Sequence, residues 1–274
     1  MRRLFKKLSQ RYRYSIILLR ELVRTDFKLR YQNSVLGYLW SLLRPLSLFV
    51  ILYVVFVKIL GVSGDIPHPG VYLLIGIVVW NYFAEVTNNS VVSVVAKGDL
   101  LRKVNFPRYV IILAGSFSAL INLFFNFIII AIFMIITRTE ISGAVIFLPL
   151  LIIELFIFSL AVGFLLSGLY VKYRDISFIW EVAMQGAFFA TPIMYAFSLV
   201  SKKSPIAAKI LICNPVAQIM QDMRYALVSR QSETVWSVFG NALSYILPIM
   251  IVMLFTAFAG YYFKSRSPHF AEEV

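Results

Sequence analysis

The side chains that could perform chemistry are few in this chain and widely spaced. Its 274 residues include 13 acidic side chains, two histidines (His68 and His269) and one cysteine, Cys213. The sequence contains no Ser/His/Asp set, H-E-x-x-H pair or carboxylate pair of the kind that hydrolases use. One cysteine cannot form an internal disulfide, and two distant histidines do not support a metal site. We therefore expect neither catalysis nor a metal in this chain.

A nucleotide-binding site is not expected either. A phosphate-binding loop has the form G-x-x-x-x-G-K-[ST], and Gly98, which follows Lys97, lacks that context. The chain is not expected to hydrolyse ATP alone or to hold a cofactor. A process driven by ATP would need a second polypeptide that binds ATP and Mg²⁺.

The elements that position these residues are predicted to be membrane-spanning helices. Hydrophobic residues make up 60% of the chain and the mean hydropathy is +0.83, which excludes a water-soluble surface. The predicted fold class is an all-α integral membrane protein with six spans. These cover about Tyr38 to Leu60, Val71 to Val94, Tyr109 to Ile136, Ala144 to Val171, Phe178 to Phe197, and Ala242 to Phe263.

The positive charges orient these spans. An even number of spans places both termini on one side, and that side holds 19 of the 26 lysines and arginines, ten of them in the first 30 residues. The positive-inside rule makes this side the cytoplasm. The excess of positive charge is therefore explained by topology, and no nucleic-acid partner is expected.

The N-terminal segment is predicted to form an amphipathic helix before the first span. At helical spacing, Ile16, Leu19 and Val23 share one stripe, and Arg20 and Arg24 lie on an adjoining one. Such a helix lies either in the membrane interface, among membrane lipids, or on a partner protein, and the pattern allows both.

Polar residues within the predicted spans form two kinds of pattern. One face of the fifth span carries residues at steps of three or four, which indicates a partner helix or a path for a polar substrate: Ser177, Glu181, Gln185, Phe188, Pro192 and Tyr195. Small-residue series in the third span (Gly115, Ser118, Asn122, Asn126) and the fourth (Ser159, Gly163, Ser167) predict close helix contacts. Glu85 and Glu154 lie deepest, and each needs a buried partner or water.

Two segments between the spans are also informative. The loop from 95 to 108 places Asp99 where it could cap a short helix that Pro107 would close, and this helix would present leucines and basic side chains. It could dock on a soluble partner or be an ordinary charged loop. The segment 198–240 is half-apolar and interrupted by Pro215, Asp222 and Arg224, so short helices at the outer side suit it better than a full span.

Several motifs resemble the polysaccharide-export branch of the type-2 ABC transporter permeases, whose members export O-antigen, capsule or teichoic acid. The likeness is carried by RELVRTDFKLRYQNSVLGYLWSLLRPL at 20–46, LLRKVNFPR at 100–108, YVKYRDIS at 170–177, TPIMY at 191–195 and NPVAQIMQDMRYAL at 214–227. These motifs follow the order of the family and extend over most of the chain.

The resemblance implies an arrangement and a set of partners. Segment 1–37 would be the cytoplasmic interface helix, 38–263 the six-span transmembrane domain with re-entrant helices at 198–240, and 264–274 a cytoplasmic tail. The chain would form a homodimer in the bacterial cytoplasmic membrane above two copies of an ABC ATPase subunit. The coupling helix that contacts this ATPase would comprise Gly98, Asp99, Leu100, Leu101, Arg102 and Lys103.

The implied substrate is a polysaccharide linked to polyprenyl pyrophosphate. Its anionic head would first meet Arg24, Lys28, Arg30 and Arg44, although anionic lipids would attract the same side chains. Its translocation path would be lined by Tyr38, Trp40, Tyr53, Glu181, Gln185, Phe188 and Tyr195. Two alternatives stay open at this point: a type-2 permease for a small lipid or drug, and a membrane-embedded transferase that acts on lipid-linked glycans.

Overall fold

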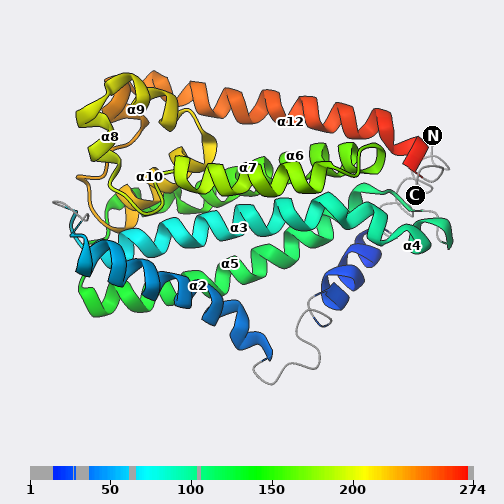
Figure 1. The fold of residues 1–274 in the computed structure, drawn as a ribbon, viewed down its shortest axis with the longest axis horizontal. Coiled ribbons are helices and arrows are strands. Elements are labelled where there is room, and N and C mark those ends of the chain that lie inside the picture. The colour runs from blue at the N-terminus through cyan, green and yellow to red at the C-terminus, as the bar shows by residue number, and fades with distance from the viewer. Residues whose placement is uncertain (1–14, 27, 29–36, 62–65, 104–105, 271–274) are drawn as a thin grey trace.

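The chain forms a long bundle of helices (Figure 1). The computed structural model describes residues 15–26, 28, 37–61, 66–103 and 106–270, and within these ranges it contains helices and no strand. Five helices are long and apolar enough to cross a membrane. The predicted all-α membrane fold is therefore confirmed, whereas the count of six spans stays a prediction.

Five long helices make up the body of the bundle. The first is α2 (Trp40–Leu52), which η1 (Gly37–Leu39) precedes and which continues as the π-helix η2 (Tyr53–Ile59). The next two are α3 (Pro69–Ala96) and α5 (Tyr109–Thr137). The fourth, α6 (Leu148–Lys172), follows η3 (Gly143–Phe147), and the fifth, α12 (Ile246–Arg266), lies between η4 (Ala242–Tyr245) and η5 (Ser267–His269).

Helix α3 is the centre of the bundle. It contacts α2, α5, α6, α7 and α10, and 78% of its most apolar stretch is buried, against 28% or less in the other four long helices. The uncharged run from Val71 to Val79 is buried at every position, which suits a stretch of helix that neighbours cover on every side. Beyond this run, α3 carries polar side chains on two faces, and each of these faces lines a groove described below.

Small residues let α6 approach α3 closely. A Cβ atom added at Gly163 would lie 2.6 Å from Oγ of Ser90, and Ser159 and Ser167 are fully buried on the same helix. This confirms the close contact predicted for the fourth span. In lipid the hydrophobic effect does not drive helices together, so close van der Waals contact between small residues stabilises their packing. The corresponding prediction is wrong for Gly115, because a Cβ atom there would meet open space.

The predicted fifth span is shorter than the others. Helix α7 (Ile176–Ala190) ends before Thr191 and Pro192, so Pro192 lies beyond the helix and not on its polar face as predicted. Four short helices follow: α8 (Phe197–Lys203), α9 (Pro205–Ile212), α10 (Pro215–Leu227) and α11 (Val235–Phe239). They gather at one end of the bundle, here called the α10 end (Figure 1).

The opposite end, here called the α4 end, holds the N-terminal helix (residues 15–26) and α4 (Gly98–Lys103) (Figure 1). Leu18, Leu19 and Leu22 of the N-terminal helix pack against Phe106 and the start of α5, together with Leu100 of α4. Of the predicted amphipathic stripe, Leu19 therefore packs within the chain itself, whereas Ile16 is exposed.

Candidate functional site

Residues 98–103 form a short helix over the same residues that the resemblance implies for a coupling helix, but Asp99 and Pro107 do not delimit this helix as predicted. Helix α4 begins at Gly98, so Asp99 lies inside its first turn and does not cap it. The helix ends at Lys103, and Pro107 precedes α5 instead of closing α4. Asp99 and Lys103 are exposed, whereas Leu100 is held in the apolar cluster with the N-terminal helix. The side chains of Leu101 and Arg102 lie outside the described residues.

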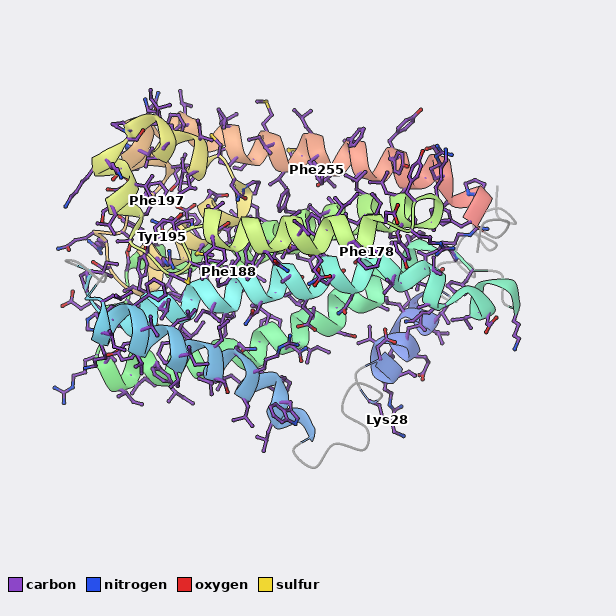
Figure 2. All side chains as sticks on the ribbon, viewed as in Figure 1. Lys28, Phe178, Phe188, Tyr195, Phe197 and Phe255 are labelled. Carbon is purple, nitrogen blue, oxygen red and sulfur yellow. The ribbon has the colours of Figure 1, made fainter. Side chains whose placement is uncertain are left out.

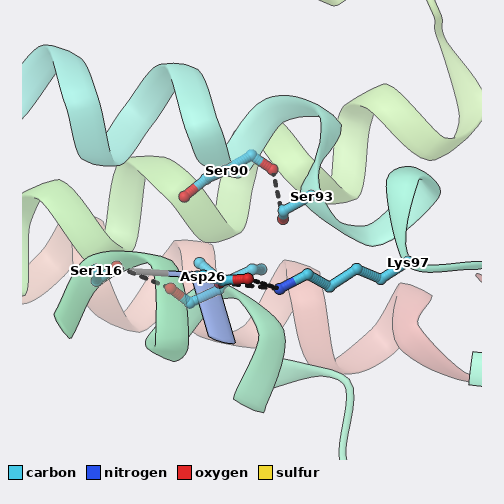
Figure 3. A network of polar contacts seen from close by, with 6 residues as sticks. Asp26, Ser90, Ser93, Lys97 and Ser116 are labelled. Carbon is cyan, nitrogen blue, oxygen red and sulfur yellow. Dashed lines mark hydrogen bonds and ion pairs between the residues drawn. The ribbon is translucent and has the colours of Figure 1, made fainter. Parts of the chain in front are cut away.

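An ion pair ties this end of α3 to the N-terminal helix. Nζ of Lys97 lies 3.0 Å from both carboxylate oxygens of Asp26 (Figure 3). Lys97 is the last residue before α4, and Asp26 is 71 positions earlier in the chain. A displacement of α4 by a bound protein would therefore act on α3 and on the N-terminal helix together.

A first groove, the aromatic groove, lies between α3 and α7. Its volume is about 620 Å³, and Trp80 and Phe188 meet across it with ring centroids 5.8 Å apart. The polar face of α7 forms one side of this groove. The lining residues are Trp80, Ala84, Asn88, Val91, Val92, Ser177, Trp180, Glu181, Met184, Gln185, Phe188 and Phe189.

A second groove, the amide groove, lies between α2, α3 and α5 and has a volume of about 450 Å³. Five asparagine side chains, one carboxylate and one guanidinium line it. Its residues are Trp40, Ser41, Arg44, Pro45, Asn81, Ala84, Glu85, Asn88, Asn89, Asn122 and Asn126. Ala84 and Asn88 line both grooves, so the two grooves flank the same strip of α3.

Hydrogen bonds hold the inner wall of the amide groove in place. Nδ2 of Asn122 donates to Oε1 of Glu85 at 2.9 Å, which provides the partner that this deep carboxylate was predicted to need. Nδ2 of Asn126 donates to the carbonyl oxygens of Asn122 at 2.8 Å and Ser41 at 3.5 Å, and so joins α5 to the start of α2. The asparagines predicted to serve helix contact thus also form a polar wall.

The structure brings together part of the predicted translocation path. Glu181, Gln185 and Phe188 line the aromatic groove, and Trp40 lines the amide groove. Tyr53 lines neither groove. Its ring instead packs near the start of α3, beside Gly70, with its centroid 5.6 Å from that of the Phe49 ring.

Tyr195 also lines neither groove, and the side chain of Tyr38 lies outside the described residues. Because α7 ends at Ala190, Tyr195 does not continue the face of that helix, and its hydroxyl donates to the carbonyl oxygen of Ala190. Figure 2 shows Phe188 on the bundle and Tyr195 nearer the α10 end, beside Phe197.

The predicted phosphate-binding cations do not form one cluster. Arg44 lines the amide groove, whereas Arg24 and Lys28 are exposed on the N-terminal segment and line neither groove. Figure 2 shows Lys28 on that segment. Arg30 lies outside the described residues. Arg44 is therefore the member of this set that the structure places beside the predicted path.

The sequence shows Arg224 as an interruption of an apolar segment, but in the structure this side chain anchors α10. This side chain is completely buried, and its guanidinium donates to the carbonyl oxygens of Tyr72, Pro192 and Ile193 at 3.1, 2.6 and 3.0 Å. It also donates to Oε1 of Gln221 at 2.8 Å and lies 3.5 Å from the centre of the Tyr72 ring. A buried guanidinium needs this many acceptors, and it joins α10 to α3 and to the bend after α7.

A second polar cluster lies beside this arginine. Asp222 accepts hydrogen bonds from Nε2 of Gln218 at 2.7 Å and from the hydroxyl of Tyr245 at 3.0 Å. Gln218 also interacts with Glu154 of α6, the second deep carboxylate. Burial raises the pKa of Asp222 to about 6, because the charged form loses its hydration. The sequence signal for this cluster was the i, i+4 spacing of Gln218 and Asp222.

Comparison with known proteins supplies the family context of these grooves. Residues 17–228 match the family described as ABC-2 type transporter. Two O-antigen export system permease proteins RfbA of Klebsiella pneumoniae are 30% and 28% identical over 219 residues, which is 80% of this chain and 83% of each relative. A protein of the same name from Myxococcus xanthus is 25% identical over 263 residues, 96% of this chain and 97% of the relative.

Proposed function

Because this chain belongs to the ABC-2 type transporter family, we propose that it is the permease that exports a polysaccharide carried on polyprenyl pyrophosphate. The chain is a multi-pass membrane protein similar to O-antigen export permeases, and such a permease is not itself an enzyme. The cargo, the ATPase partner and the homodimeric assembly are the parts that we propose.

The observation that carries this proposal is the pair of grooves beside α3. Polar side chains on an exposed helix face are costly against lipid, so such a face belongs on protein or on a polar path. The aromatic groove adds flat rings, and rings stack on sugars without selecting one repeat unit. Together the grooves offer a surface along which a polar polymer slides.

A second copy of the chain would close this path. Helix α7 exposes Phe178, Ile179, Val182 and Phe189, and α2 exposes Val50 and Ile51 among other apolar side chains. The grooves lie between these two helices on α3, so a homodimer that covers α2 and α7 would enclose them. The exposed apolar side chains would then contact protein or lipid.

The energy would come from two copies of a separate ABC ATPase that holds ATP and Mg²⁺. Exposed Asp99 and Lys103 on α4 would meet that subunit, and the Asp26–Lys97 pair would transmit its movement to α3. Basic residues gather toward the α4 end, which supports placing both termini in the cytoplasm of a bacterial cell.

The test is to co-express the chain with the ABC ATPase encoded beside it, purify the complex and measure ATP turnover and polymer export. Asp99→Arg should separate the two subunits or uncouple hydrolysis from export. Glu140→Arg is the matched control, because Glu140 is an exposed acid in the turn at the α10 end.

Three results would overturn the proposal. Failure to recover any ATPase with the chain removes the energy source. Stimulation of ATP turnover by lipophilic compounds but not by glycolipid indicates a permease for small molecules. Activity of the isolated chain that is lost in Glu85→Gln or Glu154→Gln indicates a transferase.

A further inference from the structure

The amide groove has a composition that suits one class of ligand. Its described lining carries one positive group, Arg44, and one negative group, Glu85, so its charge is close to balanced. A phosphate site would need several cations or backbone N–H groups aimed at one point. Carboxamides instead offer one acceptor and two donors each, which matches the mixed donor and acceptor character of sugar hydroxyls.

The groove lies at a depth in the membrane where polar side chains need polar partners. Asn81 and Asn89 are 12 and 20 residues from the start of the 28-residue α3, and Asn122 is 13 residues from the start of the 29-residue α5. At 1.5 Å per residue these helices are about 42 to 44 Å long, so their middle lies within the roughly 30 Å hydrocarbon core. Exposed amides at that depth need polar partners.

The side chains of the groove are divided into a fixed wall and an open one. Asn122 and Asn126 are buried and engaged with Glu85 and with α2, as described above. Asn88 and Asn89 are exposed on α3, and Asn81 is partly exposed. Trp40 presents a half-exposed indole at the start of α2. A ring with polar edges and an apolar face could therefore be held by the amides and covered by the indole.

We infer that the amide groove binds a neutral glycosyl unit next to the pyrophosphate of the lipid-linked substrate. This inference rests on the proposed function and adds a sugar subsite to it. Asn81 and Asn89 donate to and accept from the hydroxyls, Trp40 covers the ring, and Arg44 lies beside the first phosphate. A volume of about 450 Å³ is in the range of pockets that hold small ligands, which limits the subsite to one or two sugar rings.

The test compares two lipids that differ only in the sugar. The full chain, purified in phosphatidylcholine nanodiscs, is titrated with geranylgeranyl pyrophosphate and with the same lipid carrying one glucose. We expect the wild type to bind the glycosylated lipid more tightly. Asn89→Leu and Asn81→Leu should each weaken the binding of the glycosylated lipid about five- to tenfold, as expected for the loss of one hydrogen bond of about 1 kcal/mol. Both variants should bind the sugar-free lipid as the wild type does.

Two controls separate the subsite from general damage. Thr137→Val removes an exposed hydroxyl near the end of α5, outside both grooves, and should change neither affinity. Asn89→Ser, which keeps a donor and an acceptor, should retain more of the affinity for the glycosylated lipid than Asn89→Leu.

The other possible outcomes each contradict a specific part of the proposal. Equal losses for both lipids, or no loss for either, overturn the subsite while leaving the export proposal intact. Absence of wild-type binding to both lipids contradicts the proposed function itself. If nanodiscs that contain phosphatidylglycerol abolish the preference for the glycosylated lipid, the groove binds the hydroxyls of a phospholipid headgroup, and the glycan assignment fails.

Discussion

At the α10 end, a buried cation fastens a short helix to the bundle, whereas at the α4 end a partly exposed ion pair fastens another. Arg224 is fully buried and donates to three backbone carbonyls and one side chain. The side chains of Lys97 and Asp26 are 25% and 27% exposed and form one ion pair. Each contact joins segments that are far apart in sequence.

This difference implies different mobilities at the two ends. Breaking the Arg224 contacts leaves buried carbonyls without donors, and each such group costs about 1 to 3 kcal/mol. An ion pair that remains in contact with water contributes about 0 to 1 kcal/mol. The Arg224 contacts should therefore act as a fixed frame at the α10 end, whereas the ion pair at the α4 end can open at small cost.

Loss of the arginine should have the largest effect. Arg224→Met removes the donors to Tyr72, Pro192 and Ile193, so we expect unfolding to become easier by at least about 3 kcal/mol. Thermal unfolding of the purified chain in detergent measures this change. Arg230→Met, at an exposed position on the same side, is the control and should change little. Equal effects of the two substitutions would contradict the fixed frame.

Crowding the same contact should have the next largest effect. A Cβ atom at Gly76 would lie 2.5 Å from Nη2 of Arg224 and 3.0 Å from the carbonyl oxygen of Ile193. Gly76→Val should therefore lower the free energy of unfolding by about 1 to 3 kcal/mol. Gly115→Val serves as the comparison in α5, where a Cβ atom meets open space. A smaller loss at Gly76 than at Gly115 would show that the arginine yields easily.

The third largest effect should be a pH dependence of stability that comes from Asp222 at the α10 end. The pKa of Asp222 is about 6 in the folded chain and near 3.9 when unfolded, so folding favours its protonated form. This stabilisation is present at low pH and diminishes as the pH rises from about 4 to 6. Between pH 5 and pH 7 we expect the free energy of unfolding to fall by about 1 kcal/mol.

The measurement is thermal unfolding at both pH values for the wild type and Asp222→Asn. The groups facing this carboxyl are Gln218, Tyr245 and Glu154, and the first two are hydrogen-bonded to it. The variant keeps these neighbours and should lose about 1 kcal/mol of the pH dependence. An unchanged slope in the variant would assign it to another group.

The smallest effect on stability is expected at the α4 end. Asp26→Asn should change the free energy of unfolding by no more than about 0.5 kcal/mol, because the pair is partly hydrated. In complex with the ATPase it should nevertheless lower export per ATP hydrolysed. Restoring the pair in reverse, with Asp26→Lys and Lys97→Asp together, should recover part of the coupling. A stability loss as large as that of Arg224→Met would remove the contrast between the two ends.

Much of the fold could be predicted from apolar length and charge. Five of the predicted spans are long helices, and α4 forms within the predicted coupling loop, because runs of about 20 apolar residues and helix-favouring local patterns are properties of neighbouring residues. The face shared by Glu181, Gln185 and Phe188 followed from helical spacing for the same reason. Pro192 and Tyr195 were misplaced on that face, because its spacing does not reveal where α7 ends.

Local spacing along the chain was enough to show that it is a multi-pass helical protein and which residues share a helix face. The packing of the helices was needed to show that Asn81 and Asn89 of α3 line one groove with Arg44 of α2 and Asn122 of α5. The same packing places Arg224 against backbone carbonyls of residues 72, 192 and 193. Carbonyl groups are the same at every residue, so no side-chain pattern marks the ones that a distant guanidinium will reach.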